Sequence, residues 1–281
     1  MQNTFKSMMS AAIATTALIG LYLAAPIPAS AFGVGVQPST VEMTVKPGDR
    51  QRQVVTIGNV HKTKTISLTM GLADWALDEN GKLVLNPPGE TDRSAADWVR
   101  FSPASVTLKP ETSQDVVVEI STPFKIKEKG DHRFALLATT LLPELDKRGD
   151  VSGVWNRYQL ASLFYLTLTP SESTPVVESA GFVAGDAPSL TFKIKNDGDA
   201  HARLMGTALI KNASGELVSE TPLSTVVLDR HARKYDVKIV APEGLPAGEY
   251  TADIELTNTF APQNRFRSTP VEVAPITFVN P

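Results

Sequence analysis

The sequence predicts an all-β protein built from two β-sandwiches in tandem. Three observations lead to this prediction. Short segments that alternate apolar with polar residues follow one another along most of the chain, turn residues separate them, and the same series of segments begins again in the second half. The chain has 281 residues, and its 20 prolines and 18 glycines are spread along it rather than gathered in blocks. Helix-period stretches are nearly absent, so strands are expected to supply both cores.

The charge and cysteine counts exclude several classes of partner and chemistry. There are 27 Lys and Arg residues against 30 Asp and Glu residues, which gives a formal net charge of -3. This balance supplies no bulk field to attract nucleic acid or anionic lipid, and nucleic acid is not expected as a partner. The chain has no cysteine. Disulfides, thiolate nucleophiles, cysteine-based zinc sites and iron–sulfur ligation are therefore all excluded.

Residues 1–31 have the three-part pattern of a signal peptide. Lys6 gives a positive start, residues 11–25 form an uncharged apolar run, and the segment ends in the small residues Ala29, Ser30 and Ala31. We expect cleavage after Ala31 and export of the remaining chain. A membrane anchor is the alternative, but the apolar run ends at the helix-breaking Pro26 and Pro28, and no basic stop-transfer cluster follows it. No later segment approaches the ~20 apolar residues of a membrane span, so none is expected in the mature chain.

The first predicted sandwich is a series of short strands joined by turns. Residues 41–45 alternate apolar with polar, the turn at 46–49 contains Pro-Gly, and residues 53–57 resume as a strand. Asn80-Gly81 lies between two apolar segments, and this dipeptide predicts a hairpin because both residues tolerate positive φ. Two later segments, residues 116–120 and 134–138, have the same strand character. With them, about seven strands precede Pro170, which is the number of strands in an immunoglobulin-like sandwich.

A polar segment with proline at both ends divides the chain. We interpret residues 170–175 as a linker between one immunoglobulin-like domain at 32–169 and a second at 176–281. Four features of the first half recur in the second in the same order, which indicates two related sandwiches. They are a strand ending in Asn (Asn59 and Asn196), a hairpin turn (78–81 and 213–216), a paired-strand segment (106–120 and 226–239), and a glycine-led strand (Gly130 and Gly248).

No pattern of catalytic or metal-binding residues stands out. The four histidines form no i, i+4 pair, and we expect them on the surface or in loops. Residues 196–199, Asn-Asp-Gly-Asp, are interpreted as a solvated turn rather than a calcium site, since the 12-residue EF-hand loop is missing. No Gly-x-Ser-x-Gly elbow occurs. We therefore expect a protein that is not an enzyme, with no catalytic residues, no cofactor and no bound metal.

The last strand before the linker is unusual because residues 159–169 carry no charge. An edge strand is normally protected by charged residues. The segment is therefore either buried on both faces, in the core or against the second domain, or it is an edge that pairs with another polypeptide. The charged, glycine-containing segment that precedes it, residues 145–153, is expected to be a long hairpin loop.

Residues 32–170 resemble the periplasmic pilus-assembly chaperones, the PapD-like family. The resemblance rests on Trp98 followed by Pro103, a Leu108-Lys109-Pro110 turn, a strand led by Arg133, and the apolar closing strand. It implies that the closing strand donates alternate apolar side chains to an unfinished pilus subunit. The matching donors are Leu160, Phe164, Leu166 and Leu168.

The same resemblance implies a periplasmic location and two kinds of partner. One is a secreted β-rich surface or pilus subunit, and the other is an outer-membrane usher. Family members bind the C-terminal carboxylate of the subunit with an Arg and a Lys. The matching positions here hold Thr40 and Leu163, and no basic residue replaces them within 38–43 or 159–169.

A second function remains open from the sequence. The turns, the hairpin and the linker also resemble two-domain cell-envelope proteins that bind WxL surface proteins and peptidoglycan. A structural or adhesive envelope protein would keep its closing strand buried and would bind a partner protein or glycan through loops such as residues 146–150.

Overall fold

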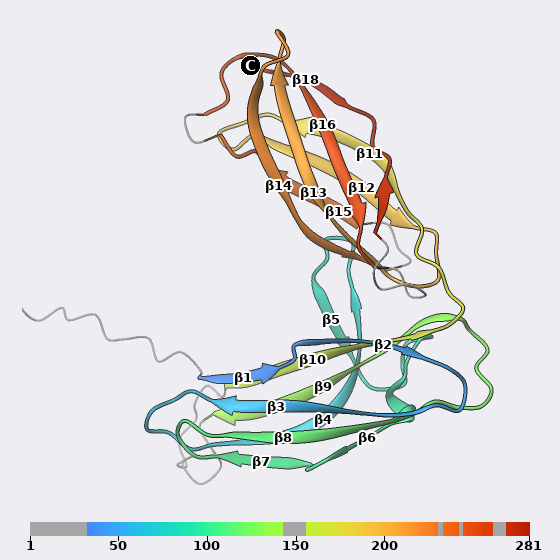
Figure 1. The fold of residues 1–281 in the computed structure, drawn as a ribbon. Coiled ribbons are helices and arrows are strands. Elements are labelled where there is room, and N and C mark those ends of the chain that lie inside the picture. Colours follow the sequence, from blue (N-terminus) through green and yellow to red (C-terminus); the bar gives the residue numbers. More distant parts are fainter. Residues whose placement is uncertain (1–32, 143–155, 230–232, 242–243, 261–267) are drawn as a thin grey trace, which may run out of the picture. The chain divides into compact units, whose positions relative to one another are not determined.

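The computed structural model describes residues 33–142, 156–229, 233–241, 244–260 and 268–281 (Figure 1). The expected signal peptide at 1–31 and the loop at 146–150 lie outside these residues. Val34–Pro281 form one compact unit. Within the described residues the only helix is the 3-10 turn Ala96–Trp98, and no helix there has the length and apolar character needed to cross a membrane.

The first ten strands form two packed sheets. One sheet has the order β1-β3-β8-β6, and the other has the order β2-β10-β9-β4-β5, with β7 also paired to β4. The strands of the first sheet are β1 (Val34–Gln37), β3 (Arg50–Asn59), β8 (Ser113–Ser121) and β6 (Val99–Ser102). Those of the second are β2 (Thr40–Val45), β10 (Asn156–Leu168), β9 (Gly130–Leu142), β4 (Ile66–Leu77), β5 (Leu83–Asn86) and β7 (Ser105–Leu108).

The remaining eight strands form a second pair of sheets that shares no strand with the first pair. Their orders are β11-β12-β15 and β14-β13-β16-β17, with β18 also paired to β16. The strands are β11 (Pro175–Val183), β12 (Ser189–Asn196), β13 (Ala202–Asn212), β14 (Leu217–Leu228), β15 (Arg233–Lys238), β16 (Gly248–Asn258), β17 (Thr269–Val271) and β18 (Ile276–Asn280). The predicted fold class, two immunoglobulin-like sandwiches in tandem, is confirmed.

Each sandwich has its own hydrophobic core, because alternate side chains of a strand point to the same face. In the first sandwich, the rings of Phe134 on β9 and Phe164 on β10 stack with their centroids 4.3 Å apart. In the second, Phe192, Ile194 and Ile210 are among the buried residues of a separate cluster. Each core is assembled from residues far apart in the sequence.

Both predicted hairpins are present. Gly81 adopts a φ of 76° and its N–H donates to the Asp78 carbonyl, which closes the turn between β4 and β5. The Asn212 N–H donates to the Glu216 carbonyl between β13 and β14. The structure has ten strands before Pro170 where about seven were expected. The strands that were not expected, β1 and β6, are four residues each, and so short a segment carries little alternation.

The repeated asparagines have the same role in both sandwiches. Asn59 and Asn196 are each 2% exposed at the end of a strand. Each side-chain oxygen accepts the backbone N–H two residues on, from His61 and Gly198 respectively. Each amide group also donates to a buried carbonyl, that of Leu108 or Ala200. The pattern that indicated a repeat thus reflects one turn used twice, because an asparagine can replace backbone partners where a strand ends.

Candidate functional site

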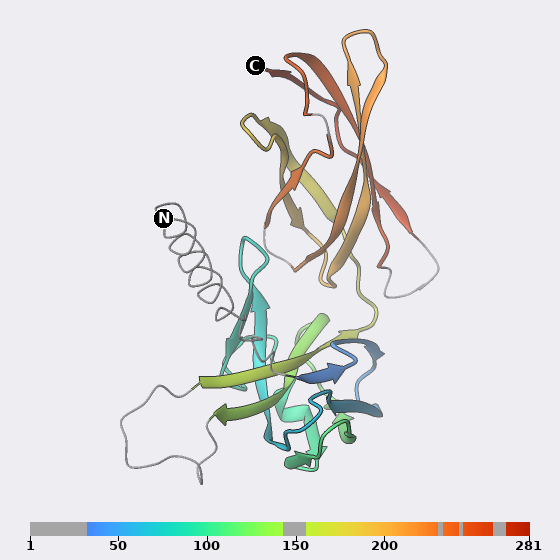
Figure 2. The same ribbon diagram turned by 90° about the vertical axis from the view of Figure 1, so that its left-hand side faces the viewer.

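The closing strand β10 has two halves with different partners. Along its whole length it pairs with β9 in antiparallel register, from Asn156 opposite Leu142 to Leu168 opposite Gly130. Figure 2 shows the two strands running in opposite directions. On its other side, β2 pairs with it in parallel, but only over residues 163–168. Within the described residues, the segment 156–161 has no strand on that second side.

Three of the four expected donor side chains lie inside the protein. Phe164 and Leu166 are 0% exposed and Leu168 is 5% exposed. Leu160 is half-buried and is the only one of the four that lies in the half of β10 without a second partner. The two alternatives for this strand therefore apply to different halves. Residues 164–168 are buried and Leu163 is half-buried, whereas residues 156–161 form a sheet edge.

The unpaired edge presents backbone groups of odd-numbered residues. The Leu163 N–H donates to the Ser39 carbonyl at 2.9 Å, so residue 163 directs its polar backbone atoms away from β9. Because successive residues of a strand alternate in direction, Gln159 and Ala161 direct theirs the same way, toward the unpaired side. The side chains of Tyr158 and Leu160 lie on the same face of the strand as that of Phe164.

Thr40 and Leu163, which occupy the positions of the carboxylate-binding Arg and Lys of the chaperone family, are neighbours in the structure. They face each other as the first residue pair of the parallel β2–β10 ladder. Neither side chain carries a charge, so this pair offers nothing to neutralise a carboxylate.

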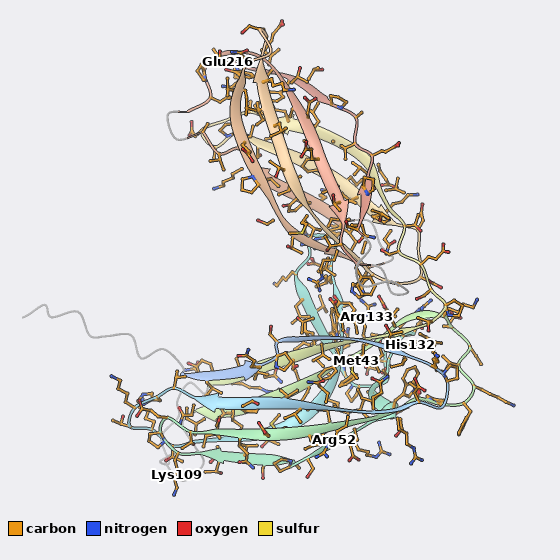
Figure 3. The ribbon with its side chains drawn as sticks, in the orientation of Figure 1. Met43, Arg52, Lys109, His132, Arg133 and Glu216 are labelled. Carbon is orange, nitrogen blue, oxygen red and sulfur yellow. The ribbon has the colours of Figure 1, made fainter. Side chains whose placement is uncertain are left out.

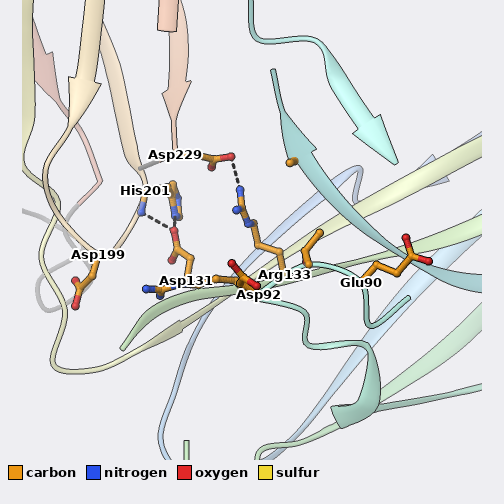
Figure 4. Close-up of a pocket in the computed structure, with 10 residues that line it drawn as sticks. Glu90, Asp92, Asp131, Arg133, Asp199, His201 and Asp229 are labelled. Atoms are coloured by element: carbon orange, nitrogen blue, oxygen red, sulfur yellow. Dashed lines mark hydrogen bonds and ion pairs between the residues drawn. The ribbon is translucent and has the colours of Figure 1, made fainter. Parts of the chain in front are cut away.

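A cluster of charged side chains lies between strands of the two sandwiches (Figure 4). Asp131 on β9 accepts a hydrogen bond from Thr167 Oγ1 at 2.7 Å and lies 2.9 Å from His201 Nδ1. The other ring nitrogen of His201, Nε2, lies 3.4 Å from Glu42 Oε1. Arg203 forms an ion pair with the same Glu42 carboxylate. One histidine therefore connects carboxylates from β2 and β9.

The pKa values in this cluster shift in the directions expected of a buried imidazolium between two carboxylates. Burial by itself would lower the pKa of His201, but hydrogen bonds and charges from Asp131 and Glu42 outweigh it and raise that pKa. Burial opposes ionisation of Glu42, yet His201 and Arg203 lower the pKa of its carboxyl group to about 2. The pKa of Asp131 is lowered for the same reasons, with Thr167 contributing a hydrogen bond.

Arg133 makes a second connection between the sandwiches. Its side chain lies near the start of β9 (Figure 3) and forms an ion pair with Asp229. Its guanidinium carbon also lies 5.2 Å from the centre of the Trp75 ring, a cation–π distance. A cavity of about 570 Å³ is lined by members of both ion pairs, together with Glu90 and Asp92. Both ion pairs therefore border one polar cavity.

The expectation that the histidines lie at the surface or in loops is wrong for His132, which is buried on β9. His201 lies in the connection between β12 and β13, as expected, but it is buried there, and His231 lies outside the described residues. His201 is 1% exposed and His132 is 5% exposed. The His132 ring packs on Trp98, with the centroids 4.6 Å apart, and burial lowers its pKa. Sequence reasoning missed the His201 cluster because its partners lie far along the chain. The one available signal was Asp131, His132 and Arg133 in succession at the start of an apolar strand.

The turn at 196–199 is only partly solvated, contrary to expectation. Asn196 and Gly198 are buried. A Cβ atom on Gly198 would come within 2.2 Å of the Glu172 carbonyl oxygen, so the turn packs closely on the segment between β10 and β11. The Asp131 N–H donates to the Asp199 carbonyl at 3.0 Å. The Asn, Asp and Gly residues thus serve packing between the sandwiches. Among the residues that the structure describes, no group of three His, Asp or Glu side chains is placed to hold a metal ion.

No family model matches the chain, and no curated protein matches it. Solved structures do resemble it. The YadV chaperone is 10% identical with a TM-score of 0.42 and covers 85% of this chain and 100% of its own. The E. coli chaperone DraB is 10% identical with a TM-score of 0.41, covering 86% and 98%. A chain of the CsuC–CsuE chaperone–tip adhesion subunit complex of Acinetobacter baumannii is 13% identical with a TM-score of 0.40, covering 86% and 97%. At these identities and scores the likeness carries no conclusion about activity or partners.

Proposed function

We propose that this protein is a periplasmic chaperone that binds a secreted β-rich surface or pilus subunit by strand pairing during the subunit's assembly. The observation that carries this proposal is the half-paired strand β10. Residues 156–161 keep one side unpaired in the described residues, next to a segment where the same side is occupied by β2. A strand of the subunit fits that place as an extension of the sheet.

The side chains of this segment suit the role. Gln159 and Ala161 supply backbone donors and acceptors along the unpaired side, and Tyr158 and Leu160 supply apolar surface on one face. Backbone bonds at a sheet edge give affinity, and alternate side chains that enter a groove of the partner give selectivity. We infer that strand pairing provides most of the affinity, because neither Thr40 nor Leu163 can form an ion pair with a carboxylate. In this proposal Leu160 keeps its donor role, whereas Phe164, Leu166 and Leu168 hold the strand in its own sandwich.

Gln159→Pro is expected to weaken subunit capture by about tenfold or more while the protein stays folded. Proline removes one N–H on the unpaired side, and loss of a buried hydrogen bond costs ~1–3 kcal/mol. It removes no bond to β9, since the N–H of residue 159 points away from that strand, and proline is tolerated at such edges. The measurement is a pull-down of the variant from envelope extract of its host, with bound proteins quantified by mass spectrometry.

Two further variants complete this experiment. Gln159→Ala removes the same side chain but keeps the N–H, and it is expected to capture the subunit normally. Placing a photo-crosslinking residue at Tyr158 identifies what lies against the edge. Equal capture by Gln159→Pro and Gln159→Ala contradicts pairing at this edge. Crosslinks confined to the second sandwich would instead favour a structural or adhesive envelope protein.

A further inference from the structure

Two connections lie side by side at one end of the first sandwich. The turn between β2 and β3 and the connection between β8 and β9 are joined by backbone hydrogen bonds. The Gly48 N–H donates to the Pro123 carbonyl at 3.1 Å, and the Thr122 N–H donates to the Asp49 carbonyl at 2.9 Å. The Thr122 hydroxyl also donates to the Lys46 carbonyl at 2.7 Å. These bonds hold the two connections together as one surface.

Phe124 projects from this surface. It is 87% exposed, more than any other large hydrophobic residue that the structure describes. Its ring lies against Gly48, where an added Cβ atom would come within 2.7 Å of the ring atom Cε1. Gly48 also has a φ of 80°, which side-chain-bearing residues rarely adopt. A glycine backbone therefore supports the ring on one side and leaves most of it in solvent.

Basic residues lie close in the sequence to Gly48 and to Phe124. Lys46 lies in the turn between β2 and β3, and Arg50 is the first residue of β3. Lys125 and Lys127 lie in the connection between β8 and β9, and all four residues are exposed. We call these four residues and Phe124 the Phe124 tip. None of the four forms an ion pair with another described residue. The nearest acid in the sequence, Asp49, accepts the backbone N–H of Lys46 at 2.8 Å.

The neighbouring Glu128 does not offset this charge at the tip. Its carboxylate lies 3.3 Å from the Arg93 guanidinium and is compensated there. The tip thus carries four basic residues, although the chain as a whole has a formal net charge of -3. Its attraction for an anion is therefore local rather than a property of the whole molecule.

We propose that the Phe124 tip docks this protein reversibly on an anionic lipid surface, with the Phe124 ring inserted at the interface and the four basic side chains against the headgroups. A lipid interface is favoured over an acidic protein because one aromatic ring on a projecting connection, supported by a glycine, offers no groove or extended face for a shaped partner. A lipid interface needs no complementary shape. A phenylalanine ring is apolar enough to be buried at the boundary between headgroups and acyl chains, and basic residues near an anionic membrane each contribute ~1 kcal/mol.

Vesicle co-sedimentation of the exported, processed protein tests this proposal. The vesicles contain either phosphatidylglycerol with phosphatidylcholine or phosphatidylcholine alone. Binding is expected only to the anionic vesicles and is expected to fall steeply in high salt. Phe124→Ser is expected to weaken binding by about tenfold or more, and the double variant Lys125→Ser with Lys127→Ser by about thirtyfold.

Val60→Ser is the matched control. Val60 is 75% exposed and is followed closely by Lys62 and Lys64, but it lies on another connection, after β3. This variant is expected to bind anionic vesicles as the unchanged protein does. The proposal is overturned if the anionic vesicles bind no more protein than neutral ones, if the Phe124 and lysine variants bind normally, or if Val60→Ser loses as much affinity as Phe124→Ser.

Discussion

Phe164→Asp is expected to unfold the first sandwich. The Phe164 side chain is 0% exposed and stacks on Phe134 at the centre of the core. Truncating a buried phenylalanine costs ~3–5 kcal/mol. The unpaired carboxylate adds a desolvation penalty, so the total approaches the ~5–15 kcal/mol by which a whole domain is stable. Urea unfolding followed by circular dichroism measures the effect.

The control for Phe164→Asp is the same change at an exposed position of the same sandwich. Val54 on β3 is 39% exposed, and Val54→Asp is expected to cost less than about 1 kcal/mol. A folded Phe164→Asp protein that failed only to capture its partner would contradict the burial of this side chain. It would restore Phe164 as a donor to another polypeptide. If Phe164→Asp unfolds the protein, as expected, this variant cannot be used to test partner binding. Gln159→Pro is then the variant that tests it.

Asp131→Asn is expected to destabilise the folded protein by about 3–5 kcal/mol near pH 5.5. Asparagine has nearly the same shape but leaves the buried His201 imidazolium without one of its two carboxylates. Breaking a buried ion pair by removing one charge costs about that much, because the remaining charge is left uncompensated. The free energy of unfolding from urea titrations of both proteins gives the difference.

The same cluster predicts how stability depends on pH. His201 has a raised pKa in the folded protein, so its contribution is complete below its ordinary value of 6.5 and is lost as pH rises through the raised value. Glu42 changes in the opposite direction. The pKa of its carboxyl group is lowered from 4.5 to about 2, so its contribution is complete above pH 4.5 and is lost as pH falls toward 2. The cluster should therefore stabilise the protein most between pH 4.5 and 6.5.

Urea titrations at a series of pH values test this dependence. His201→Gln is the comparison, since glutamine cannot titrate. The unchanged protein is expected to lose stability above pH 6.5 relative to this variant. If the two pH profiles run parallel from pH 5 to 9, His201 is not held as an imidazolium and the assigned cluster is wrong. Asp229→Asn serves as a second control, because it changes the separate ion pair to Arg133.

Much of the fold could be predicted because it depends on local patterns. Alternation identified the principal strands, and the Asn80-Gly81 turn fixed one hairpin, since both follow from the backbone preferences of a few adjacent residues. The two Asn-ended strands indicated the repeat for the same reason. The short strands β1 and β6 were not identified because their pairing depends on their neighbours, β3 and β8, rather than on their own residues.

The site depended on contacts that no local pattern contains. The sequence showed that the closing strand carries no charge from residue 159 to 168. The absence of charge therefore did not distinguish its two halves. Only the place where β2 pairs decides that Phe164 is core and Leu160 lies by the unpaired edge. His201 meets Asp131 and Glu42 only after two sandwiches have folded. The sequence alone therefore determined the fold class, the repeat and the candidate strand. The tertiary structure decided which half of that strand is accessible and which charges are paired, because burial and ion pairing depend on residues brought together from distant parts of the chain.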